Sequence, residues 1–212
     1  MPRIARPRIA RVLALIVLTS AIAAAARAQV AVEAIPKEFL QQFAAIAVGL
    51  FPQQIPNPPV KVEPNPELAV GCHVMQKAAL VIFPDKAVTD KTIGEAGEKE
   101  TPLGIVSTLG LTVDTGADKL ASADDLYLLN VDGSTKLPIL YFTVKSQGTD
   151  RILSVYSKAG KALATTPLKK GNGNGAAAYD VTLKNIDHEK QRADAVFTLQ
   201  GYEATLRVGR LE

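Results

Sequence analysis

Residues 193–208 read ADAVFTLQGYEATLRV, two runs in which apolar and polar residues alternate. In the first run Ala195 and Phe197 fall on one side of an extended chain, and polar residues fall on the other. Gln200-Gly201 separates the runs and supplies the positive φ that a tight hairpin turn needs. The stretch therefore predicts a β-hairpin with one buried face.

Similar runs, about ten residues apart, occupy the chain from residue 67 to its end, a spacing typical of antiparallel sandwiches and barrels. The expected strands are residues 68–74, 78–83, 103–113, 126–131, 137–145, 151–156, 162–166, 177–185, 193–199 and 202–208. Residues 151–167, RILSVYSKAGKALATTP, resemble one hairpin of an immunoglobulin-like module. We predict an all-β fold, an antiparallel immunoglobulin-like β-sandwich, over residues 67–212. The polar segment 84–102 is expected to be a long loop within it.

The N-terminus has the pattern of an export signal over residues 1–28. Arginines without acids come first, an apolar run follows over residues 12–26, and Ala26 and Ala28 bracket Arg27 as a signal peptidase requires. The apolar run is shorter than the roughly 20 residues that span a bilayer. We predict cleavage after Ala28, a periplasmic or secreted product, and no stable membrane span after cleavage. Retention of the segment as a membrane anchor is the alternative.

Residues 29–66 are expected to form a short N-terminal helix and a proline-rich strap. Pro36 suits a first helical position, which predicts a helix over residues 36–51. Its apolar positions recur at helical spacing and comprise Phe39, Phe43, Ile46, Ala47 and Leu50. Residues 52–66 are so rich in proline that an extended connector is predicted there.

Charge and cysteine content exclude several classes of protein. The chain has 24 Lys+Arg and 21 Asp+Glu. Residues 1–28 hold five arginines and no acid, so the remainder has 19 basic and 21 acidic residues. A nucleic-acid partner is therefore not expected. Cys72 is the only cysteine, which rules out an intramolecular disulfide.

The sequence Leu-Thr-Val-Asp-Thr-Gly-Ala-Asp over residues 111–118 is the sharpest motif. It resembles the active-site loop of retroviral-type aspartic proteases, and the resemblance implies a homodimer in which Asp114, Thr115 and Gly116 form the catalytic loop. Two such aspartates share one proton and activate a water molecule. The later motif of that family is matched only by residues 206–209, which include a charged arginine. The same residues also suit an ordinary Asx turn, and this is the interpretation we prefer.

The other polar clusters suggest weaker possibilities. Four nearby aspartates could chelate Ca²⁺, but they lack the alternate spacing of a calcium loop; they are Asp114, Asp118, Asp124 and Asp125. Cys72 and His73 are neighbours on an expected strand and so point to opposite faces. His188 lies in an expected turn, and residues 171–175, GNGNG, are expected to be a loop rather than a phosphate cradle.

No cofactor or metal site is predicted. The chain has no tryptophan, the residue on which carbohydrate sites usually rely, so carbohydrate binding has no support in the sequence. The function that we expect is an exported, non-enzymatic binding or interaction protein of the cell envelope or extracellular space. Its partner is an unidentified protein or small ligand. The alternative from another class is the homodimeric aspartic protease based on Asp114.

Overall fold

The computed structural model describes residues 31–74, 77–158, 160–171 and 177–211. The predicted signal peptide, residues 1–28, lies outside them. The strands are β1 (Val32–Ala34), β2 (Val70–Val74), β3 (Ala78–Pro84), β4 (Thr101–Leu109), β5 (Leu111–Val113), β6 (Tyr127–Asn130), β7 (Lys136–Gln147), β8 (Asp150–Tyr156), β9 (Ala164–Lys170), β10 (Tyr179–Asp187), β11 (Arg192–Leu199) and β12 (Tyr202–Arg210). The helix α2 covers Lys37–Gln54, and the 3₁₀ turns η1 and η2 cover Pro66–Leu68 and Ala123–Asp125.

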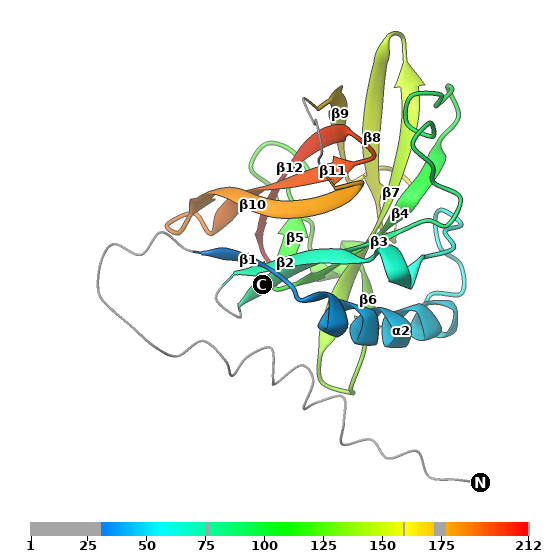
Figure 1. Cartoon of the computed structure of the whole chain (residues 1–212). Helices are drawn as coiled ribbons and strands as arrows, with labels where there is room; N and C mark the ends of the chain where they lie inside the picture. The colour runs from blue at the N-terminus through cyan, green and yellow to red at the C-terminus, as the bar shows by residue number, and fades with distance from the viewer. Residues whose placement is uncertain (1–30, 75–76, 159, 172–176, 212) are drawn as a thin grey trace, which may run out of the picture.

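The strands hydrogen-bond along one path in the order β1-β2-β3-β4-β7-β8-β9-β12-β11-β10. Off this path, β5 pairs with β12 and β6 with β7, and all the pairings are antiparallel. The last strand, β10, returns to lie against β2, so the sheet curls almost into a barrel (Figure 1). The antiparallel all-β prediction is confirmed. The immunoglobulin-like sandwich is not, because β9 and β12 pair and join the strands into one sheet.

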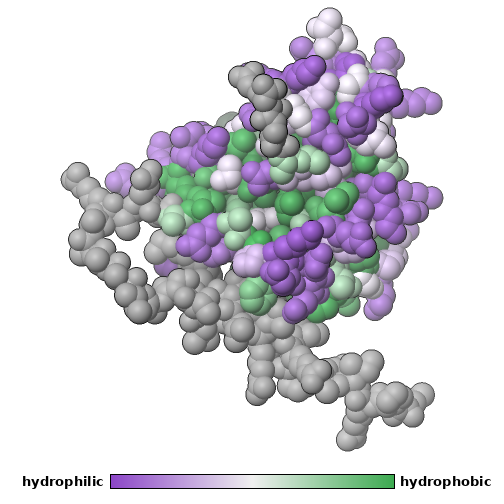
Figure 2. Space-filling model, in the orientation of Figure 1, coloured by the Kyte–Doolittle hydropathy of each residue, from purple (hydrophilic) through white to green (hydrophobic). Residues whose placement is uncertain are grey.

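Alternation along the strands produces two hydrophobic cores on the two sides of this sheet. On β3, Leu80 and Ile82 belong to the core inside the barrel. Val81 and Phe83, which alternate with them, belong to a second core between the sheet and α2. Both faces of β3 are therefore buried, which explains why its sequence is apolar at nearly every position. In Figure 2, hydrophobic residues gather towards the middle of the visible face, and hydrophilic residues cover most of its rim.

Helix α2 packs on the outer face of the sheet with a stripe that differs from the predicted one. Its buried residues are Leu40, Ala44, Ala47 and Phe51, which follow one another at three- and four-residue intervals. Of the predicted stripe only Ala47 is fully buried, and Phe39 and Phe43 pack at its margin. The aromatic rings of Phe43 and Phe51 both contact Phe83, with centroids 5.8 and 5.7 Å apart.

The helix and its connector depart from the predicted boundaries. The predicted connector begins at Pro52, but α2 continues through this proline to Gln54, and the N–H of Ile55 still donates to the carbonyl of Phe51. A proline in the last turn costs the helix one hydrogen bond without ending it. At the other end, Asn65 caps η1 by accepting from the N–H of Glu67, so the strand predicted from residue 68 begins at Val70.

The strand predicted over residues 103–113 is two strands. Gly110 has φ +66° and separates β4, which pairs with β3 and β7, from β5, which pairs with β12. A Cβ at this position would lie 2.7 Å from the carbonyl oxygen of Lys77. The glycine therefore allows the chain to cross from one side of the barrel to the other.

The connection between β3 and β4 is a long loop, as predicted, but part of it packs into the hydrophobic core. Ile93 is completely buried in the barrel core. Arg151 of β8 fixes the loop by donating from Nε to the carbonyl of Ile93 and from Nη2 to that of Gly94. The loop therefore closes one end of the barrel.

Candidate functional site

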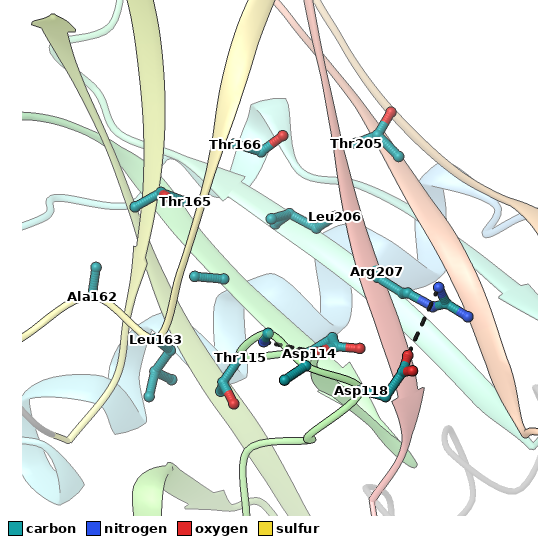
Figure 3. A pocket seen from close by; sticks show the side chains of 13 residues that line it. Asp114, Thr115, Asp118, Ala162, Leu163, Thr165, Thr166, Thr205, Leu206 and Arg207 are labelled. Carbon is teal, nitrogen blue, oxygen red and sulfur yellow. Dashed lines mark hydrogen bonds and ion pairs between the residues drawn. The ribbon is translucent and has the colours of Figure 1, made fainter.

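The ladder between β9 and β12 is much shorter than the strands that form it. Its register pairs are Tyr202 with Lys170 and Glu203 with Lys169. Beyond them the two strands diverge, as Figure 3 shows, and β12 next pairs with β5 from Val208 onward. Within the described residues, β12 therefore has no strand partner along this edge at positions 204–206.

A proline accounts for the early end of this ladder. If the register continued, Pro167 would lie opposite Thr205. Proline has no N–H, so it cannot donate to the carbonyl of Thr205, and prolines are found in sheets where no ladder hydrogen bond is required. Pro167 is exposed and keeps its register pairing with Ile152 on the β8 side. Only the β12 side of β9 is left open.

The divergence opens a pocket of about 600 Å³, within the size range of ligand sites. It is lined by residues 162–166 on the β9 side, residues 205–207 of β12, and residues 114–118 at one end (Figure 3). We call it the β9–β12 pocket, and residues 114–118 the 114–118 loop. Leu206 is buried at the pocket, whereas Thr165, Thr205 and Arg207 are exposed. The lining combines hydroxyl groups, the guanidinium group of Arg207, the carboxylates of Asp114 and Asp118, and a small apolar surface.

The 114–118 loop has an unusual backbone. Gly116, Ala117 and Asp118 follow one another with φ values of 104°, 52° and 58°. Non-glycine residues adopt this left-handed region at a cost of about 1 kcal/mol or more each, and strained backbone concentrates at functional sites. Hydrogen bonds from the N–H and the hydroxyl of Thr115 to the carbonyl of Lys119 close the turn.

Arg192 of β11 holds the loop in place from outside the turn. Its Nη1 donates to Oδ2 of Asp114 at 3.1 Å, and its Nη2 donates to the carbonyl oxygen of Asp118 at 2.5 Å. The side chains of Arg192 and Asp114 are only 13% and 8% exposed. The other carboxylate oxygen of Asp114 accepts from the N–H of Gly116 at 2.8 Å. Asp114 therefore forms the expected Asx turn and a buried ion pair.

This geometry bears on the protease motif. The motif requires that the carboxylate of Asp114 face a second carboxylate and share a proton with it. Here its two oxygens accept from Gly116 and Arg192, and the side chain is nearly buried. Thr115 and Gly116, the other residues of the motif, are exposed at the end of the pocket. The three predicted residues are thus together, in a loop whose carboxylate is already paired.

Three of the four aspartates considered as calcium ligands, Asp114, Asp118 and Asp125, have separate partners. Asp125 accepts from the hydroxyl and the N–H of Ser122, and the side-chain hydrogen bond is the main cause that lowers the pKa of Asp125. Asp118 lies 4.0 Å from Arg207. In the described part of the chain, no group of three or more His, Cys, Asp or Glu side chains could hold a metal ion.

Cys72, His73 and His188 lie in three different environments. Cys72 is buried in the barrel core, and burial raises the pKa of its thiol to about 12. His73 is directed to Glu33 of β1, with Nε2 3.6 Å from the carboxylate. His188 is exposed in the turn after β10. Residues 172–175 of the predicted glycine-rich loop lie outside the described residues.

Sequence reasoning did not find most of the pocket. It identified residues 114–118, but not residues 162–166 and 205–207, which come from strands that look ordinary in isolation. One signal was present in Pro167, which interrupts the apparent run of β9.

Among the described helices, none is long and apolar enough to cross a membrane. Comparison of the chain with models of known protein families finds no match, and comparisons with curated proteins and with solved structures find none either.

Proposed function

We propose that this chain is a non-enzymatic binding protein of the cell envelope or extracellular space, and that it binds its ligand in the β9–β12 pocket. The observation that carries the proposal is the open edge of β12, which leaves a pocket of about 600 Å³ in the wall of an otherwise well-packed barrel. Natural barrels usually close or cover such edges. An edge kept open by Pro167 is consistent with a ligand that occupies it.

The chemistry of the lining favours binding over catalysis. Thr115, Thr165, Thr166 and Thr205 offer hydroxyl groups that can donate and accept. Arg207 offers a positive charge and Asp118 a negative one, and the carboxylate of Asp114 is already paired with Arg192. Neither described histidine is among the lining residues, so none can act there as the base that activates a threonine. Such a set of groups orients and holds a polar ligand.

Export supports the proposed location. The signal-like residues 1–28 would deliver the barrel outside the cytoplasm. N-terminal sequencing of the protein secreted or exported from its cells tests this part. A mature terminus at residue 29 supports it, and a terminus at residue 1 contradicts it.

A ligand screen with matched variants tests the pocket. The full chain is screened by ligand-observed NMR against three sets of probes: short peptides, neutral oligosaccharides and small organic anions. Thr205→Trp places a large ring at the mouth of the pocket. Thr182→Trp places the same ring on β10, at a position that lies across from Val196, the β11 partner of Thr205. We expect at least one probe to bind the wild type and Thr182→Trp but not Thr205→Trp. Equal binding to all three proteins, or no binder, would contradict the proposal.

A separate assay tests the alternative, an aspartic protease activity based on Asp114. The full chain is incubated with casein at acidic pH, with and without an aspartyl-protease inhibitor. We expect no inhibitable cleavage, because the carboxylate of Asp114 is paired with Arg192. Inhibitable cleavage that disappears in Asp114→Asn would replace the binding proposal with the protease.

A further inference from the structure

The direction of the backbone groups along β12 can be read from its neighbours. The carbonyl of Gly201 accepts from Gly171, and the carbonyl of Arg207 accepts from Asp114, so both point to the edge that faces β9 and β5. Backbone groups alternate along a strand, and β12 pairs with β11 without a register shift. The N–H and C=O of Thr205 therefore point to this same edge, into the β9–β12 pocket.

The opposite wall presents a second open edge. The N–H of Gly171 points from the end of β9 towards β12, and Lys169 pairs with Glu203 in the same direction. The register of β9 with β8 has no shift over residues 164–168. By the same alternation the N–H and C=O of Thr165 and the C=O of Pro167 point into the pocket. Within the described residues, the N–H groups of Thr165 and Thr205 have no backbone partner.

Side chains on the two walls alternate in step with these edges. Leu206 belongs to the barrel core and Ala164 packs against it, so both side chains face inward. Thr165 and Thr205 are exposed on the outer surface. An extended segment between the walls would thus have small apolar side chains directed inward and polar ones directed outward.

The charges at the end of the pocket that the 114–118 loop forms are balanced. The side chain of Arg207 is 48% exposed and lies 4.0 Å from the carboxylate of Asp118, which also lines the pocket. The carboxylate of Asp114 is paired with Arg192. The pocket therefore favours neither sign of charge, and the backbone groups of its two walls are the features that select a ligand.

We propose that the β9–β12 pocket takes an extended peptide segment, which adds a strand between β9 and β12. This inference rests on the proposed binding function and specifies its ligand. The segment would hydrogen-bond to the backbone groups of Thr165 on one side and of Thr205 on the other. Main-chain hydrogen bonds give the affinity in this mode of recognition, and alternate side chains give the specificity. Pro167 keeps the two walls from pairing with each other in the absence of the peptide.

Selection from a random heptapeptide library displayed on phage tests the ligand class. The full chain is the target, and Thr205→Trp is used to remove phage that bind elsewhere. Enriched peptides are synthesised, labelled with fluorescein and measured by fluorescence anisotropy. We expect the enriched peptides to have alternating small apolar and polar residues. Failure to enrich any peptide would overturn the inference, whereas the wider ligand screen above would still test the pocket.

N-methylation of the enriched peptide tests whether it binds as a strand. A methyl group on a backbone nitrogen that faces a wall removes one hydrogen bond and should weaken binding about tenfold. In an inserted strand successive backbone N–H groups point to the two walls in turn, so methylation at each position that lies between the walls should weaken binding, whereas methylation at the ends of the peptide should not. Peptides that tolerate N-methylation throughout but still fail to bind Thr205→Trp would overturn strand addition while leaving the binding pocket in place.

One substitution in the protein completes the test. Pro167→Thr restores an N–H opposite Thr205 and should let β9 and β12 pair, which reduces peptide affinity about tenfold or more. Thr182→Trp serves as the unaffected control, and each variant must unfold cooperatively as the wild type does. Unchanged affinity in Pro167→Thr would contradict the proposal.

Discussion

Arg192 and Asp114, which are 78 residues apart in sequence, form an ion pair at 3.1 Å in which both side chains are almost buried. The same arginine also donates to the carbonyl of Asp118. Strand β11 thereby fixes a loop that contains three successive residues with positive φ. The shape of the pocket's closed end depends on this one side chain.

Loss of Arg192 should therefore be costly. Arg192→Ala leaves the carboxylate of Asp114 buried without its counter-ion and should reduce the free energy of unfolding by about 3 kcal/mol. Arg207→Ala is the matched control, because Arg207 pairs loosely with Asp118 at the surface and its loss should cost less than about 1 kcal/mol. Urea denaturation of both variants measures the difference. Similar losses would show that the Arg192 pair has no special role.

The substitution Ala117→Gly should stabilise the protein, although replacing alanine by glycine usually destabilises one. With φ +52°, Ala117 carries a steric cost that glycine does not, so Ala117→Gly should raise the free energy of unfolding by up to about 1 kcal/mol. Ala45 is exposed within α2, and Ala45→Gly should lower it by about 1 kcal/mol. Thermal denaturation of the two variants should give shifts of opposite sign. Shifts of the same sign would contradict the backbone described for the loop.

Tyr156 should make stability depend on alkaline pH. Burial first, and then its hydrogen bond to Glu100, raise the pKa of Tyr156 from 10.0 to about 12. The folded state therefore holds the phenolic proton more tightly than the unfolded state. This contribution is complete below pH 10 and is lost as the pH rises to about 12. Tyr156→Phe should show a smaller fall in the free energy of unfolding over this interval. Curves that stay parallel to pH 12 would contradict the prediction.

Phe83 should be the main anchor of α2. It is completely buried, and the rings of Phe43 and Phe51 pack against it. Phe83→Ala should lower the free energy of unfolding by about 4 kcal/mol, because it removes a large side chain from the core between the helix and the sheet. Phe39→Ala, at the partly buried margin of the same core, should cost less than half as much. Equal costs in urea denaturation would show that α2 is not held mainly through Phe83.

The strands were largely predictable because alternation reports directly which face of a strand is buried. In β11 and β12 the predicted boundaries differ from the observed ones by one or two residues. The helix stripe was harder, since α2 has apolar residues on more than one side, and burial of Leu40, Ala44 and Phe51 depends on how the helix packs on the sheet. The short strand β1, Val32–Ala34, has too few residues to show any period.

The pocket could be predicted only in part. The turn at Asp114 is encoded locally, since its carboxylate bonds to a backbone group two residues away. Its partner Arg192 and the open edge at Thr205 depend on which strands become neighbours, and this information is not local. Pro167 could have signalled an open edge, but only after β9 and β12 were known to be adjacent.

The most direct test of the binding site is hydrogen exchange at the backbone amide of Thr205, measured by NMR on the full chain. Ala204 and Leu206 point to β11 and pair with it, so their amide protons should exchange slowly. The amide of Thr205 points into the pocket and should exchange much faster, and a bound peptide should slow it. If the Thr205 amide exchanges as slowly as its two neighbours in the free protein, the edge is not open and the proposed site does not exist.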